Sequence, residues 1–135
     1  MAKKKKTSTP KSDPDSWKTT ERALTEHLSE DLLEAWQKLR AYSLRLGEQR
    51  VYASGKAIMF AKKTCFFFVR PKKSYLEVVI FLADAKKRKD FKSVTPVSKT
   101  KYAHTFKLVH ADQVEGVFTN SIQESFSSIF FESND

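Results

Sequence analysis

Apolar residues in the first half of the chain recur at the spacing of a helix. The stripe consists of Leu32, Leu33, Trp36, Leu39 and Leu46, and Ser43 fills its remaining place. Ser29 can cap the free N–H groups ahead of this stripe, and the two acids that follow it suit the positive end of the helix dipole. Gly47 tolerates a left-handed conformation and can end a helix. The pattern predicts a helix from about Ser29 to Gly47, with a short turn over residues 24–28 packed onto it.

After Arg50 the pattern becomes extended. Apolar, aromatic and β-branched runs predict strands over residues 57–61, 65–69, 75–82 and 102–110. Pro71 favours a tight turn between the second and third of these strands. Because the runs 65–69 and 78–82 are apolar at both parities, we expect these strands to be central in the sheet and covered on both faces. The last strand alternates, with Lys107 opposite a row formed by Tyr102, His104, Phe106 and Leu108.

The remaining segments are a polar connection and a second helix. Residues 84–100 are rich in Lys and Asp and predict a loop. Asp112 and Glu115 have the spacing of a capping box, which predicts the start of a final helix. The apolar stripe of that helix consists of Val114, Val117, Phe118, Ile122, Phe126, Ile129 and Phe130. The serines in 125–128 weaken it, so we expect fraying after about residue 130.

The order of these elements predicts an α+β fold. We expect a four-stranded, mainly antiparallel sheet with the N-terminal and C-terminal helices packed on one face. A single domain spans residues 21–132, and residues 1–20, which are rich in lysine and poor in apolar side chains, predict a disordered basic tail. The pattern does not show what covers the other face of the sheet, and self-association would supply a cover.

The net charge of +9 is unevenly distributed along the chain. Residues 50–107 hold fifteen Lys and Arg against Glu77, Asp84 and Asp90, a net charge of +12. The flanking parts of the domain are acidic, with −2 over residues 21–49 and −5 over residues 108–135. A basic centre of this kind favours a polyanionic partner.

Few residue patterns support catalysis or cofactor binding. Cys65 cannot form an internal disulfide, which suits a reducing, cytoplasmic location, and we expect it to be a small buried apolar residue. One Cys with three scattered His does not form a zinc site, and Gly47, Gly55 and Gly116 are isolated, so no glycine-rich phosphate loop is present. A Ser-His-Asp triad built from distant residues stays open, but no Ser lies in a Gly-flanked nucleophile turn. We expect a non-enzymatic protein without metal or cofactor, and no apolar run is long enough to insert in a membrane.

The first functional hypothesis is a nucleic-acid-associated accessory module. Clustered cations neutralise the backbone phosphates of DNA or RNA without reading sequence. The candidate contact residues are Arg50, Lys56, Lys62, Lys63, Arg70, Lys72, Lys73, Tyr102 and His104. Tyr52, Tyr75 and Tyr102 could stack on bases if exposed. The turn lysines could instead be solvated residues that protect a hydrophobic sheet from aggregation.

The alternative is a protein-interaction or homodimerisation module without nucleic-acid binding. It would use the uncovered sheet face or the C-terminal helix. The phenylalanines of that helix, Phe118, Phe126, Phe130 and Phe131, exceed what one helix face needs, and an exposed excess would mark an interface. A small-ligand pocket between sheet and helices is neither supported nor refuted by the sequence.

Two segments resemble a known family. The apolar strand, Pro-Lys-Lys turn and apolar strand from Phe67 to Leu82, and the later strand with His104, Thr105 and Phe106, are similar to the domain of unknown function 5655. The resemblance covers roughly residues 25–130, and it departs over 86–92, where lysines replace a Gly- and Asp-containing stretch. It implies the fold of that domain. It also implies an association with nucleases or transport, because some members are fused to restriction-type nuclease domains and others are labelled predicted transport proteins.

Overall fold

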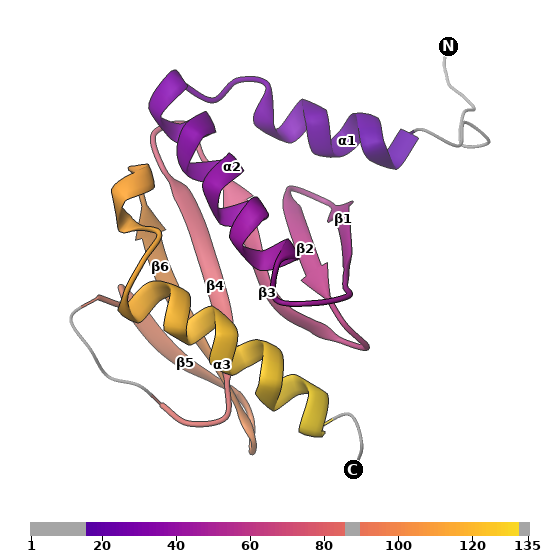
Figure 1. Cartoon of the computed structure of the whole chain (residues 1–135), viewed down its shortest axis with the longest axis vertical. Coiled ribbons are helices and arrows are strands. Elements are labelled where there is room, and N and C mark those ends of the chain that lie inside the picture. The colour runs from indigo at the N-terminus through magenta and orange to yellow at the C-terminus, as the bar shows by residue number, and fades with distance from the viewer. Residues whose placement is uncertain (1–15, 86–89, 133–135) are drawn as a thin grey trace.

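The computed structural model describes residues 16–85 and 90–132 (Figure 1). The described helices are α1 Ser16–Thr25, α2 Glu30–Leu44 and α3 Val117–Glu132, and a 3₁₀ turn, η3, covers Ala111–Gln113. The described strands are β1 Arg50–Ser54, β2 Ala57–Ala61, β3 Cys65–Pro71, β4 Leu76–Leu82, β5 Ser93–Ser98 and β6 Lys101–Leu108. Parts of the predicted tail (1–15) and of the predicted polar loop (86–89), together with residues 133–135, lie outside the described residues.

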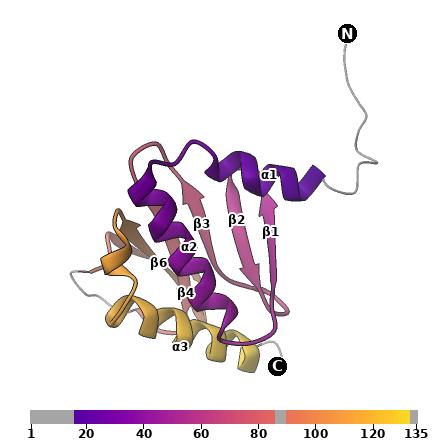
Figure 2. The same ribbon diagram turned by 45° about the horizontal axis from the view of Figure 1, so that its top comes forward.

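The strands form one antiparallel sheet in the order β1-β2-β3-β4-β6-β5. Figure 2 shows the strands from β1 to β6 side by side. The α+β class is confirmed, but the expected number of four strands is wrong, because the sheet has six. β1 pairs with β2 across the two-residue turn of Gly55 and Lys56, and β5 pairs with β6. Both additional strands lie at an edge of the sheet, where the backbone pairs on one side only and a polar, Pro-containing segment such as 93–98 is tolerated.

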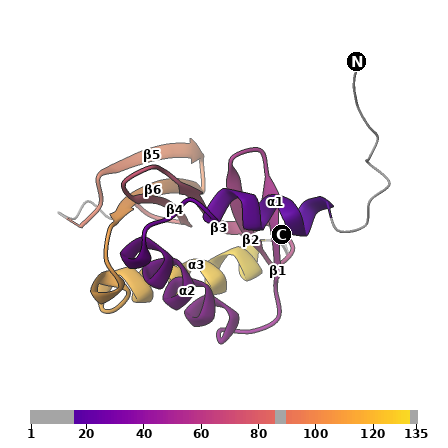
Figure 3. The ribbon, with the colours of Figure 1, turned by 90° about the horizontal axis from the view of Figure 1, so that it is seen from above.

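The two long helices lie on the same face of the sheet (Figures 1 and 3). The strand side chains buried beneath them include Ile58, Phe60, Phe67, Val69, Leu76, Val78, Ile80, Leu82, Phe106 and Leu108. The ring of Trp36 in α2 meets Phe60 edge-on, with 5.9 Å between ring centroids, and Phe60 stacks on Phe67 at 4.3 Å. On α3, the Ser125 hydroxyl contacts the carbonyl oxygens of Phe66, at 2.7 Å, and of Phe81, so this buried hydroxyl is hydrogen-bonded.

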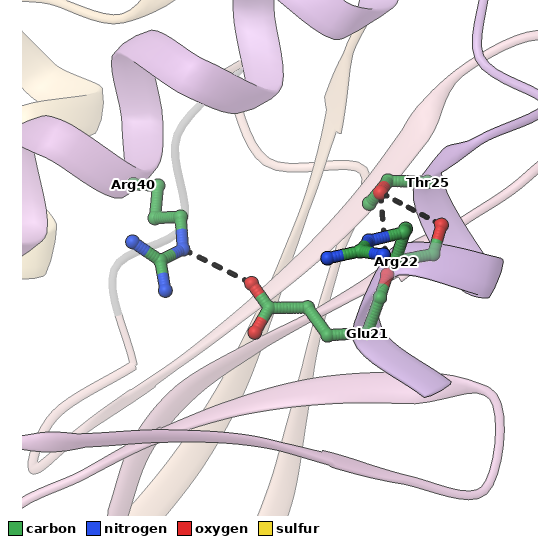
Figure 4. Close-up of polar contacts among 4 residues, drawn as sticks. All are labelled: Glu21, Arg22, Thr25 and Arg40. Atoms are coloured by element: carbon green, nitrogen blue, oxygen red, sulfur yellow. Dashed lines mark hydrogen bonds and ion pairs between the residues drawn. The ribbon is translucent and has the colours of Figure 1, made fainter. Parts of the chain in front are cut away.

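The N-terminal part of the domain contains a helix where a short turn was expected. Residues 16–20, which the sequence assigned to the tail, form the first half of α1. Leu24 and Leu28 pack against the core, and Arg40 Nε of α2 donates to Glu21 Oε2 over 3.0 Å (Figure 4). These contacts hold α1 against α2, at the end of the sheet near β1 and β2 (Figure 2).

The start of α2 agrees with the sequence prediction, and the start of α3 does not. Ser29 is the N-cap of α2, as predicted, and its Oγ accepts from the Leu32 N–H at 3.3 Å. The capping box predicted for Asp112 and Glu115 is wrong. His110 and Gln113 form it instead, and it caps η3, so α3 begins only at Val117. The physical reason is that the imidazole of His110, at the end of β6, already accepts the N–H of Asp112 at 3.2 Å.

The opposite side of the sheet, called the open face below, carries no described helix (Figure 3). β3 and β4 are central in the sheet, as expected, but the expectation that both their faces are covered is wrong for the described residues. Phe68 and Phe81 point to the open face and stay half-buried. Neighbouring side chains shield them in place of a second layer.

Candidate functional site

The strands carry five charged residues, and all five lie on the open face. They are Arg50, Arg70, Glu77, Lys101 and Lys107. Arg70, Glu77 and Lys107 form one cross-strand row over β3, β4 and β6. Arg50 and Lys101 reach the same face because side chains alternate along a strand, and their neighbours Val51 and Tyr102 pair with the helix-covered row.

The centre of the open face is apolar and aromatic. A second cross-strand row runs through Tyr52, Met59, Phe68, Val79 and Thr105. The ring of Phe81 adjoins this row, with its centroid 5.9 Å from that of Phe68. Tyr75, directly before β4, shares the side of Glu77 by the same alternation. These aromatic rings are half-buried, so part of each remains open to solvent.

Each of these four aromatic rings has a cation placed over it. Arg50 Cζ lies 5.4 Å from the centroid of Tyr52, and Arg70 Cζ lies 4.9 Å from that of Phe68. Lys101 Nζ lies 5.4 Å from Phe81. Tyr75 has Lys107 Nζ at 5.0 Å and Lys92 Nζ at 5.8 Å. Cation–π attraction holds these groups on the sheet instead of leaving them extended into water.

We call this set the cationic sheet face. It consists of Arg50, Tyr52, Phe68, Arg70, Tyr75, Phe81, Lys92, Lys101 and Lys107.

Glu77 is the acidic residue among the described strands, and it partly neutralises this surface. Its Oε1 lies 3.2 Å from Arg70 Nη1, and Lys107 is its register partner on the other side. The Arg70 side chain is 46% exposed, so this ion pair is screened by water and contributes little to stability.

The structure brings together only some of the predicted contact residues. Arg50 and Arg70 belong to the cationic sheet face. Exposed turn lysines lie at the two ends of the strands: Lys56, Lys72 and Lys73 at one end, and Lys63 at the other. The predicted cations therefore do not converge on a single point.

Lys62 points away from the cationic sheet face. Its Nζ lies 3.8 Å from the ring centroid of Phe126 in α3 and donates to the Phe126 carbonyl oxygen at 3.3 Å. Burial lowers the pKa of this lysine. Lys62 therefore joins the sheet to α3 on the helix-covered side.

Tyr102 and His104 also lie on the helix-covered side. His104 pairs with Ile80, is fully buried, and packs edge-on to the ring of Phe91 at 5.0 Å. Its Nδ1 lies 3.1 Å from the carbonyl oxygen of Tyr102. In this position the imidazole is a core residue and does not reach a ligand on the open face.

Sequence reasoning missed Lys92, Lys101 and Lys107 as members of the site. A signal for two of them is present, because the strand that alternates Tyr102, His104 and Phe106 inward must place positions 101, 103, 105 and 107 outward. Lys92 gave no such signal. It lies outside the strands and reaches Tyr75 because its N–H pairs with the Thr105 carbonyl oxygen at 2.7 Å.

Cys65 is a further residue that could support chemistry, and it is half-buried. Cys65 Sγ lies 3.1 Å from the Phe67 carbonyl oxygen, and burial raises the pKa of its thiol to about 11. A thiol with this pKa is protonated at neutral pH and is a poor nucleophile.

Within residues 16–85 and 90–132, no three His, Cys, Asp or Glu side chains are grouped so that they could hold a metal ion. None of the described helices is long and apolar enough to cross a membrane.

Comparison with known proteins gives one family and no individual relative. Neither the curated proteins nor the solved structures contain a significant match. A family model described as a domain of unknown function (DUF5655) matches residues 21–129, which include every described strand, α2, and residues 117–129 of α3. The match spans most of the chain and confirms the resemblance seen in the strand and turn pattern. The chain belongs to the DUF5655 family.

Proposed function

We propose that this domain is a non-catalytic, nucleic-acid-associated accessory module that binds DNA or RNA through the cationic sheet face. The observation that carries the proposal is the segregation of charge on the sheet. Four of the five charged strand residues are cations, all on the face that the described helices leave open, and each has an aromatic ring beside it. A cationic surface of this kind complements a chain of phosphates.

The expected binding is electrostatic and sequence-independent. The five cations of the face, with Lys92 included, would release counterions on neutralising phosphates. For about five phosphate contacts, log K should fall with log salt at a slope of about −4, which is several hundredfold between 50 and 200 mM salt. No base-reading side chain is required for this mode.

Binding is tested by fluorescence anisotropy with labelled DNA and RNA oligonucleotides at low and moderate salt. The test variant combines Lys101→Gln with Lys107→Gln, both on the open face. The matched control combines Lys38→Gln with Arg45→Gln, exposed residues in and directly after α2 on the other side of the sheet. Both doubles lower the net charge from +9 by two.

We expect the open-face double variant to bind at least tenfold more weakly and to reduce the salt slope by about 2, because each phosphate contact contributes about one unit. The control should stay within about threefold of the wild type. Equal weakening by both doubles would mean that overall charge, and not this face, governs binding. No binding at low salt by the wild type would refute the proposal.

A second candidate is a protein-interaction or homodimerisation module that uses the same face. The half-buried apolar row of Met59 and Phe68 next to Val79 favours it, because uncovered apolar surface marks interfaces. The C-terminal helix supports this candidate less, since Phe118 is buried in the core and Phe126 packs against it. Phe130 and Phe131 lie where side chains are not described. The cytoplasmic location and the association with nucleases or transport stay predictions.

A further inference from the structure

We propose that the cationic sheet face prefers unpaired nucleic acid and stacks its bases on the rings of Tyr52, Phe68, Tyr75 and Phe81. This inference rests on the proposed function, because it names the kind of nucleic acid that the same surface selects.

The rings occupy the part of the open face that a bound chain would cross. Tyr52 on β1 and Phe68 on β3 are separated by one strand, so they lie roughly 10 Å apart at the usual strand spacing. Tyr75 and Phe81 are six residues apart along β4 and its preceding residue, which corresponds to roughly 20 Å. The rings are thus spread over several nucleotide lengths, in the manner of a platform and not of a single pocket.

The four rings and five cations of this face are adjacent to one another. Each ring has at least one cationic group between 4.9 and 5.8 Å from its centroid. A nucleotide contains one base with a π-face and one phosphate, so every ring with its cation offers both contacts that one unpaired nucleotide can use. The long Lys and Arg side chains can move from ring to phosphate as the base takes their place.

A duplex can bind the cations of this face but cannot stack on its rings. Its bases are stacked on one another and present no free π-face, so it would contact the cations and leave the rings unused. Stacking of a base on an aromatic side chain changes affinity by roughly 5- to 150-fold in proteins that bind single strands. The rings therefore favour a single strand over a duplex at equal charge.

A purely protective role for the cations makes a different prediction. Lys and Arg that only shield an apolar sheet from aggregation would need apolar area beneath them but not aromatic rings. Exchange of Tyr for Leu keeps most of that area and removes the π-face. This exchange separates the two explanations.

The experiment compares four probes of about 15 nucleotides: single-stranded oligo-dT and oligo-U, a DNA duplex, and an abasic deoxyribose-phosphate strand. Each is titrated with the full chain, with the variant Tyr52→Leu with Tyr75→Leu, and with the control Tyr102→Leu, whose residue is on the helix-covered side. Thermal unfolding of each variant confirms that it is folded at the temperature of the titration.

We expect the wild type to bind at least one of the single strands about tenfold more tightly than the duplex or the abasic strand. The Tyr52 and Tyr75 double variant should lose about tenfold in affinity for that strand and nothing for the abasic strand, and Tyr102→Leu should behave as the wild type. Comparison of oligo-dT with oligo-U then separates DNA from RNA.

Two other outcomes are distinguishable. Equal affinity for single-stranded, duplex and abasic probes, unaffected by loss of the two rings, would overturn this inference and leave the proposed function in place. Absence of binding to every probe at low salt would overturn the proposed function itself.

Discussion

Gly47 lies against the ring of Phe126 with a backbone φ of +151°, a conformation that residues with side chains rarely adopt. A Cβ at this position would come within 2.9 Å of Phe126 Cζ. The Phe126 ring has little room to move, because it packs edge-on to Phe66 at 5.2 Å and lies beneath Lys62 Nζ. We therefore expect Gly47→Ala to lower the free energy of unfolding by about 2–3 kcal/mol, measured by urea denaturation.

Gly55→Ala is the control for this prediction. Gly55 also has a positive φ, of +61°, but a Cβ there would meet nothing within 4 Å. It should cost only about 1 kcal/mol, from backbone strain alone. If both substitutions cost the same, the contact of Gly47 with Phe126 does not matter.

Cys65 gives a second prediction at the scale of the residue. Because burial raises the pKa of its thiol to about 11, almost no thiolate is present at pH 8. Alkylation by iodoacetamide at pH 8 should be about 100-fold slower for the folded than for the urea-unfolded chain. The rate should climb with pH until the thiol ionises near its pKa. A plateau near pH 9 would show that the thiol titrates as if it were in water.

His104 shows why the type of a residue does not determine its role. The sequence analysis named it as a candidate nucleic-acid contact residue. The alternation of its strand already placed it beside Tyr102 and Phe106, and in the structure it is fully buried against Phe91. Phe91 comes from the segment predicted as a loop, so its contact with His104 was not available to sequence reasoning.

At the scale of the element, hydrophobic periodicity identified the helix capped by Ser29 and strands β2, β3, β4 and β6. It missed β1 and β5, because an edge strand gains its stability from pairing with one neighbour and can remain polar. Pro96 in β5 illustrates the point: a proline argues against a central strand but not against an edge one. Part of the segment assigned to a polar loop thus completes the sheet.

The row formed by β3, β4 and β6 yields the third prediction. Glu77 lies between Arg70 and Lys107, so removal of its charge frees both cations for phosphate. We expect Glu77→Gln to tighten nucleic-acid binding by roughly 3- to 10-fold at low salt, an effect that salt screens. The exposed ion pair with Arg70 is worth at most about 1 kcal/mol, so the fold should persist.

The matched control for Glu77→Gln is Glu34→Gln, an exposed position on α2 with the same change in charge. It should leave the affinity within about twofold, because screening weakens a charge on the far side of the domain. An unchanged or weaker affinity for the Glu77 variant would argue against phosphate contacts by Arg70 and Lys107. Anisotropy titrations at one low salt concentration are sufficient for this comparison.

At the scale of the whole molecule, the charge of the open face opposes self-association through it. Two copies meeting face to face would bring ten cations together, five from each copy, while the described strands supply one carboxylate per copy, that of Glu77, to offset them. We expect the chain to sediment as a monomer of 15.6 kDa at low salt. A stable dimer under those conditions that does not bind nucleic acid would favour the interaction module instead.

The sequence by itself determined the class of the fold, the family, and the identity of most central elements. It could do so because the spacing of apolar residues is a local property that each helix or strand carries in its own segment. It also determined that the middle of the chain is basic, with +12 between residues 50 and 107. None of this required knowledge of which segments meet.

Only the tertiary structure decided which charges share a surface. Arg70, Glu77 and Lys107 form a row because register pairs strands that are distant in the chain, and no local pattern fixes that register. The same pairing left Arg50 and Lys101 on the open face, while packing against α3 drew Lys62 to the other side. Long-range pairing and packing, and not residue type, thus selected the cations that form the candidate site.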